Sequence, residues 1–278
     1  MPAVYSRDSL VHLIADRMRQ HGMQCDLNCI DVSRVTDFSR VFSSSPLLRQ
    51  FNGDISKWDT SKAQSMKGMF QGSQFNGDIS KWNTASCNTM ASMFKESAFD
   101  GDISRWNVSR VIHFTETFSH GAFGDYQPDD ALASWNVERA HVLTRMFEGS
   151  SFNGDISQWR PLRATNMVAM FKDSAFCKDI SMWPLHTQPK LDISDMFKEN
   201  PAALAKQSIT PWVLDMLLKE KLPFSDQKWR LAVKRYEQLS KGLGLDPSSR
   251  YQDIAAIHSA LVAPPESMSM SLDLSSLS

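Results

Sequence analysis

Five aspartates recur at one position of a repeated segment, and they are the most regular candidates for chemistry in the chain. Each stands four residues before a tryptophan, as in "DISKW": Asp54, Asp78, Asp102, Asp155 and Asp179. A row of carboxylates could bind calcium, but calcium takes about six to eight oxygen ligands and the β-rolls that bind it have shorter repeats. One carboxylate per repeat supplies too few. We therefore interpret the aspartates as turn caps that accept hydrogen bonds from nearby backbone N–H groups, and we expect no metal ion and no cofactor.

Histidine and serine give no catalytic pattern either. His113, His120 and His141 form no pair four residues apart and no H-E-x-x-H motif. No G-x-S-x-G sequence, P-loop or dinucleotide-binding fingerprint occurs, and these are the local signals that hydrolases, nucleotide-binding proteins and dehydrogenases carry. We expect a protein that is not an enzyme.

The net charge and the hydropathy of the chain argue against a nucleic-acid-binding protein and against a membrane-spanning protein. Thirty basic and 31 acidic residues leave a net charge of −1, which gives no reason to expect nucleic acid as a partner. No run of 18 apolar residues is present, so we expect no membrane insertion. The first 22 residues lack the apolar stretch of a secretory signal. The expected location is the cytoplasm or, by a route that needs no signal peptide, outside the cell, and the expected state is a monomer.

The elements that would position these residues are internal repeats. Six tryptophans are spaced by 24 residues, except for a gap of 29 after the third: Trp58, Trp82, Trp106, Trp135, Trp159 and Trp183. A phenylalanine follows each of the first five by 12 residues: Phe70, Phe94, Phe118, Phe147 and Phe171. Such a period is the signature of stacked repeats that share one core. The tryptophans could instead form a sugar-binding ribbon, but their fixed register with an isoleucine or leucine three residues earlier favours the core.

Each repeat predicts its own local structure. In "TMASMF", Met90, Met93 and Phe94 have the i, i+3, i+4 spacing of one helical face. "DISKW" predicts a brief extended stretch, and "FNGD" predicts a turn. The sequence thus predicts an α/β repeat fold, a leucine-rich-repeat-like solenoid of about seven 24-residue coils, each with a short strand and a short helix, and helical caps at both ends.

The repeat resembles a known family. "DLNCIDVSRVTDFSRVF" from Asp26 and "FNGDISKWDTSKAQSMKGMF" from Phe51 are similar to the BspA-like leucine-rich-repeat family, a repeat of unknown function in bacterial surface proteins and mycoplasma lipoproteins. The resemblance covers about residues 26 to 197. It implies a leucine-rich-repeat-like solenoid and a role in adhesion and protein recognition. It supplies no catalytic residues.

Four segments follow from these patterns. Residues 1–25 predict an N-terminal helical cap, in which Ser6 begins a helix and Gly22 ends it. Residues 26–200 form the repeat region. Residues 201–262 carry helical patterns and predict a second cap or a small helical domain, and the serine-rich residues 263–278 predict a disordered tail.

The period breaks at one place that could carry function. Eight residues, "GDYQPDDA", separate Phe123 from Leu132, where most other repeats have three. Insertions in repeat proteins map to loops and often form the binding surface. The candidate partner-binding residues are therefore Asp125, Tyr126, Asp129 and Asp130. A neutral insertion is the alternative.

Two functions remain open at this point. The first is a non-enzymatic recognition protein that binds a protein partner, of unknown identity, through its repeat face and the 124–131 insertion. The second is a secreted or translocated bacterial effector, in which the repeats direct an activity of the C-terminal helical region.

Overall fold

The structure, a computed structural model, describes residues 4–180, 182–185, 190–200, 234 and 241. Within these residues there are two helices, α1 (Arg7–His21) and α2 (Pro46–Arg49). The Ser6 hydroxyl accepts the Ser9 N–H at the start of α1, and Gly22 ends the helix with a φ of 87°. The helix expected between Ser6 and Gly22 is therefore confirmed. The cap or domain predicted for 201–262 and the tail predicted for 263–278 lie outside the described residues, apart from the isolated positions 234 and 241.

The predicted α/β leucine-rich-repeat-like solenoid is wrong. No strand or sheet occurs in the part of the chain that the structure describes, and the repeats there contain no helix of their own besides the four residues of α2. Apart from α2, the described residues between α1 and residue 200 form turns and irregular segments joined by isolated bridges. In the described parts of the repeats, neither the expected short strand nor the expected short helix forms.

The backbone hydrogen bonds explain why the methionine and phenylalanine segments are not helical. In a helix the Phe70 N–H would donate to the carbonyl of Met66, four residues earlier. Instead it donates to the Met93 carbonyl of the next repeat at 2.9 Å, and the Gly68 N–H donates to Ala91 at 2.8 Å. Alternate N–H groups thus point sideways to the neighbouring repeat.

Left-handed residues keep the chain in this path. In most repeats one residue two before the phenylalanine and one residue two after it have φ between 50° and 64°. Such residues interrupt both helix and strand, because each needs φ below zero. The residues are Arg40, Gly68, Gly72, Ser92, Glu96, Glu116, His120, Arg145, Gly149, Ala169, Asp173, Asp195 and Glu199.

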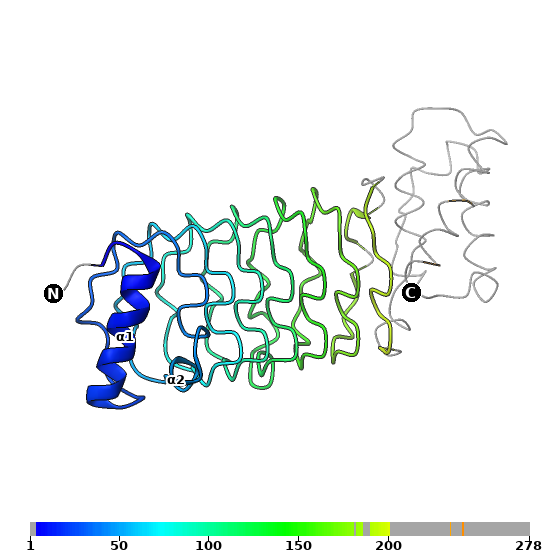
Figure 1. The fold of residues 1–278 in the computed structure, drawn as a ribbon. Helices are drawn as coiled ribbons and strands as arrows, with labels where there is room; N and C mark the ends of the chain where they lie inside the picture. The colour runs from blue at the N-terminus through cyan, green and yellow to red at the C-terminus, as the bar shows by residue number, and fades with distance from the viewer. Residues whose placement is uncertain (1–3, 181, 186–189, 201–233, 235–240, 242–278) are drawn as a thin grey trace.

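Successive repeats lie side by side along one axis (Figure 1). Six isolated parallel bridges form a continuous row that passes from Asp37 through Ser65, Thr89, His113, Val142 and Asn166 to Asp192. α1 lies at the N-terminal end of this row of repeats (Figure 1). The arrangement places equivalent residues of neighbouring repeats in contact.

Aromatic side chains fill the interior. Trp82 stacks on Trp106 with ring centroids 6.5 Å apart and planes 3° apart, and Phe70 stacks on Phe94 at 5.7 Å and 2°. The tryptophan Nε1–H groups are also satisfied: Trp106 donates to the carbonyl of Ile79 at 3.1 Å. All six repeated tryptophans are buried. The prediction that this row is core rather than a sugar-binding surface is confirmed.

Aspartate and asparagine caps turn the chain between the buried rows. The Asp78 carboxylate accepts the Ser80 N–H at 2.9 Å and the Ser80 hydroxyl at 2.7 Å. Asp54, Asp102 and Asp155 accept the N–H of the serine two residues later in the same way. The prediction that these aspartates cap turns is confirmed for these four residues.

Candidate functional site

The 124–131 loop leaves the core at a glycine. Gly124 has a φ of 113°, and a Cβ at this position would lie 2.4 Å from the backbone N and Cα of Phe152. Only glycine fits such a close approach between two backbones. Phe123 and Leu132 on either side of the loop are fully buried, so both ends of the loop are fixed to the core.

Asp100 holds the first half of the loop in place. One of its carboxylate oxygens, Oδ1, accepts the Gly124 N–H at 2.9 Å, and the other, Oδ2, accepts the Tyr126 N–H at 2.8 Å. The Gln127 amide donates to the Asp100 carbonyl at 2.6 Å and to Oδ1 at 3.0 Å. Hydrogen bonds to a carboxylate are stronger than those between neutral groups. The backbone of residues 124–127 is therefore anchored to the preceding repeat.

The loop presents an aromatic ring among carboxylates. The Tyr126 side chain is 90% exposed, although its own backbone N–H is bound. Asp125, Asp129 and Asp130 are exposed as well. The structure therefore brings all four predicted partner-binding residues to one surface loop.

The second half of the loop leans on the following repeats. The Asp129 carbonyl accepts the Asp155 N–H, and the Asp129 carboxylate lies 3.2 Å from Lys178 Nζ. Part of the charge of Asp129 is thus offset by a lysine, whereas no ion pair within the described residues involves Asp125 or Asp130. Those two carboxylates and the Tyr126 ring are the freest groups of the loop.

The sequence interpretation missed Asp100. At the equivalent position most other repeats have asparagine, whose side-chain oxygen accepts one N–H from the next repeat: Asn76 accepts the Asp100 N–H at 2.8 Å. A carboxylate has two acceptor oxygens and no donor, so it can hold two N–H groups of a longer loop. The change from "FNGD" to "FDGD" one repeat before the insertion was the available signal.

Hydrogen bonds lower the pKa of three of the capping aspartates. The pKa of Asp78 lies below the ordinary 3.8 because the hydroxyl and N–H of Ser80 donate to the carboxylate. The pKa values of Asp54 and Asp155 are lowered mainly by the N–H, and next by the hydroxyl, of Ser56 and Ser157. Their oxygens are thus engaged in the turns themselves.

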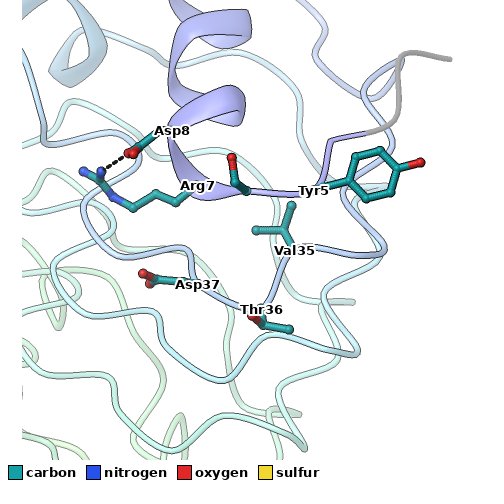
Figure 2. A pocket seen from close by; sticks show the side chains of 7 residues that line it. Tyr5, Arg7, Asp8, Val35, Thr36 and Asp37 are labelled. Atoms are coloured by element: carbon teal, nitrogen blue, oxygen red, sulfur yellow. Dashed lines mark hydrogen bonds and ion pairs between the residues drawn. The ribbon is translucent and has the colours of Figure 1, made fainter.

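A polar cavity of about 490 Å³ lies beside the start of α1 (Figure 2). Arg7 and Asp8 on one wall form an ion pair of 2.6 Å, and Thr36 and Asp37 lie on the other. Tyr5 at its rim is 65% exposed, and Arg34 lies over its ring at 5.1 Å. The side chains of Asp8, Asp37 and Arg7 do not point toward a common position in the cavity (Figure 2), so we assign no function to it.

Neither a metal site nor a membrane-spanning helix occurs among the described residues. No group of three histidine, cysteine, aspartate or glutamate side chains there could hold a metal ion, and none of the described helices has the length and apolarity to cross a membrane. The four cysteines are free thiols, and burial raises the pKa of Cys87 to about 11. A thiol with so high a pKa is a poor nucleophile.

Comparison with known protein families identifies the family of this chain. The family described as "Mycoplasma protein of unknown function, DUF285" matches residues 15–128 and 124–212, which together span more than half of the chain. No curated protein and no solved structure matches it.

Proposed function

We propose that this chain, which belongs to the DUF285 family of Mycoplasma proteins of unknown function, recognises a protein partner through its 124–131 loop and is not an enzyme. The observation that carries the proposal is the geometry of Tyr126. Its ring is 90% exposed while the backbone beneath it is hydrogen-bonded to Asp100 at 2.8 Å. An exposed aromatic ring on a fixed backbone is suited to binding rather than to folding.

Two physical arguments support this role for the loop. Tyrosine brings a large contact area with few rotatable bonds and is enriched at the sites that dominate binding energy. A loop already anchored in its bound shape also loses less conformational entropy when a partner arrives. Asp100 and Gln127 supply that anchoring through four hydrogen bonds to or from residues 124–127.

The charge of the loop narrows the kind of partner. Asp125 and Asp130 are exposed beside Tyr126, so a complementary surface would offer basic side chains around a pocket for an aromatic ring. The resemblance to BspA-like repeat proteins is part of this proposal, because members of that family are thought to act in adhesion and protein recognition.

An affinity capture with the full chain tests the proposal. The bait proteins are the unaltered chain, Tyr126→Ala, and Tyr5→Ala as a control that removes an exposed tyrosine far from the loop. We expect a partner to be captured by the unaltered chain and by Tyr5→Ala, and to be lost with Tyr126→Ala. Equal capture by all three proteins would show that the partner does not bind through Tyr126 of the 124–131 loop.

A shortened chain separates the proposal from the effector alternative. A protein that ends at residue 200 keeps the loop and lacks the C-terminal region, whose structure is outside the described residues. Provided that its melting curve shows that it folds, we expect it to capture the same partner. Loss of the partner from this folded protein would assign recognition to residues 201–278 instead.

A further inference from the structure

A second cleft, of about 500 Å³, lies at the N-terminal end of the repeats and is lined by three arginines. Its lining consists of Arg7, Arg40, Ser43, Ser44, Arg49 and Gln71. These residues come from the start of α1, from the first repeat, from the segment that contains α2, and from the following repeat. No carboxylate lines the cleft. The proposed recognition of a protein partner through the 124–131 loop does not depend on this cleft.

Two glycines leave space for the side chains of Arg40 and Arg49 at the cleft. A Cβ at Gly68 would lie 3.2 Å from Cγ of Arg40, and one at Gly72 would lie 3.8 Å from Nε of Arg49. Both glycines occupy the left-handed positions of their repeat. Every later repeat has a side chain in at least one of these two positions, for example Ser92 and Glu96. The repeat that follows Arg40 therefore leaves room for both arginine stems.

The charges in this cleft are not neutralised as they are elsewhere on the same face. In later repeats, bases have carboxylate partners: Arg145, which precedes its phenylalanine by two residues as Arg40 does, lies 3.6 Å from Glu148, and Lys95 lies 2.7 Å from Glu116. Arg7 shares its charge with Asp8 at 2.6 Å. Within the described residues, neither Arg40 nor Arg49 forms an ion pair. Two guanidinium charges thus remain without a counter-charge.

Donors remain available on these groups. Arg49 uses its Nε–H on the Ser43 carbonyl at 3.2 Å, which fixes the side chain and leaves its terminal nitrogens for a ligand. The Gln71 amide adds a neutral donor to the wall. A phosphate monoester carries a charge between about −1.5 and −2 at pH 7 and three acceptor oxygens, and arginine is the side chain whose planar fork fits such an anion.

We propose that this cleft binds the phosphate group of a small phosphorylated molecule between Arg40 and Arg49, with Arg7 and Gln71 at its sides. The volume favours a phosphomonoester over free phosphate, because pockets for small organic ligands measure about 300–1,000 Å³ and a lone phosphate would fill little of this space.

Titration calorimetry on the full chain tests the site, with glycerol phosphate and inorganic phosphate as probes and sulfate as a comparison anion. We expect one site, with glycerol phosphate bound more tightly than inorganic phosphate. Binding should strengthen as the pH rises from about 5 to 7.5, because the second phosphate pKa is about 6, and it should weaken with added salt.

Substitutions tie the binding to the cleft. Arg40→Gln and Arg49→Gln keep the stems that lie over the glycines and remove the charge, and each should weaken binding about ten-fold or more. Arg40→Lys should also weaken it, since a lysine keeps the charge and loses the fork. Arg110→Gln, an exposed arginine two to three repeats away, is the matched control and should bind normally.

Two results would overturn the inference. The first is no heat of binding for glycerol phosphate at millimolar concentration. The second is binding that sulfate matches and that the Arg40 and Arg49 variants do not change, which would mean an unspecific ionic effect. Failure here leaves the loop proposal untouched, because Tyr126 is not part of this cleft.

Discussion

Replacing Trp106 with alanine tests the packing on which both sites depend. Trp106 is 3% exposed, stacks on Trp82 at 6.5 Å, and packs against Phe94 at 6.1 Å. Its Nε1–H donates to the Ile79 carbonyl. The substitution therefore removes one large ring from a buried row and one of the two hydrogen bonds to the Ile79 carbonyl, which keeps the Trp82 N–H at 3.1 Å.

The magnitude follows from these contacts. Truncating a buried tryptophan to alanine costs about 3–5 kcal/mol. Losing the ring pair accounts for about 0.5–1.5 kcal/mol of such an effect, and losing one of the two hydrogen bonds to the Ile79 carbonyl accounts for about 0.5–1.5 kcal/mol. Because the carbonyl keeps a partner, no further penalty is added, and we expect a loss of about 3–5 kcal/mol. At about 2–4 °C per kcal/mol for a chain of this size class, the melting temperature should fall by about 6–20 °C.

Urea unfolding followed by the fluorescence of the remaining tryptophans measures the loss. Trp106→Phe is the matched control: it keeps a buried ring but removes the Nε1–H donor and part of the ring volume, so it should lose about 1–3 kcal/mol. A loss below about 1 kcal/mol for Trp106→Ala would refute the reasoning, since a ring in a continuous buried row cannot be removed at so little cost.

Three further predictions concern the turns and the loop. Millimolar calcium or a chelator should leave the melting temperature unchanged, because the capping carboxylates already bond to serine groups and offer one carboxylate per repeat; a rise of several degrees with calcium would contradict this. The folded-state pKa of Asp78 is below 3.8, so its stabilisation is present above about pH 4 and is lost as the pH falls through the lowered pKa. Asp78→Asn keeps the acceptor oxygen and should show a smaller loss of melting temperature between about pH 5 and 3, and an unchanged acid slope would argue against the cap. Replacing Gly124–Ala131 with Asn-Gly-Asp should leave the free energy of unfolding equal or raise it by up to about 0.9 kcal/mol through easier loop closure, as urea unfolding would show; marked destabilisation would mean that the loop supports the fold.

The buried rows were predictable from sequence because residue type alone fixes them. Trp82 and Phe70 recur at constant offsets, and no surface function requires such large apolar side chains in strict register. The caps were predictable for a similar reason: an aspartate two residues before a serine can accept its N–H whatever the rest of the fold does.

The local backbone was not predictable from the same patterns. Met90, Met93 and Phe94 have helical spacing, yet consecutive turns with sideways hydrogen bonds bury the same three positions. The residue that decides is Ser92, whose φ is 56°. Serine, glutamate, arginine and alanine all occupy this position in one repeat or another, so its residue type carries no signal. Only the glycines among these left-handed residues, such as Gly68 and Gly72, indicate this backbone conformation in the sequence.

The two candidate sites differ in how much of each could be predicted from the sequence. The insertion could be found by counting residues between Phe123 and Leu132, and Asp100 could have been found as one carboxylate in a row of asparagines. The arginine cleft could not, because Arg7, Arg40 and Arg49 come from three different elements. Their convergence depends on how α1 and α2 sit against the repeats.

The most direct measurement is the dissociation constant between the full chain and its captured partner, in purified form, for the unaltered chain and for Tyr126→Ala. If the ring is the dominant contact, alanine should weaken binding about thirty-fold or more, which corresponds to about 2 kcal/mol. Asp100→Asn should weaken it as well, because its amide nitrogen would face the Tyr126 N–H and release the loop. Dissociation constants within about two-fold of each other for all three proteins would contradict recognition through the 124–131 loop.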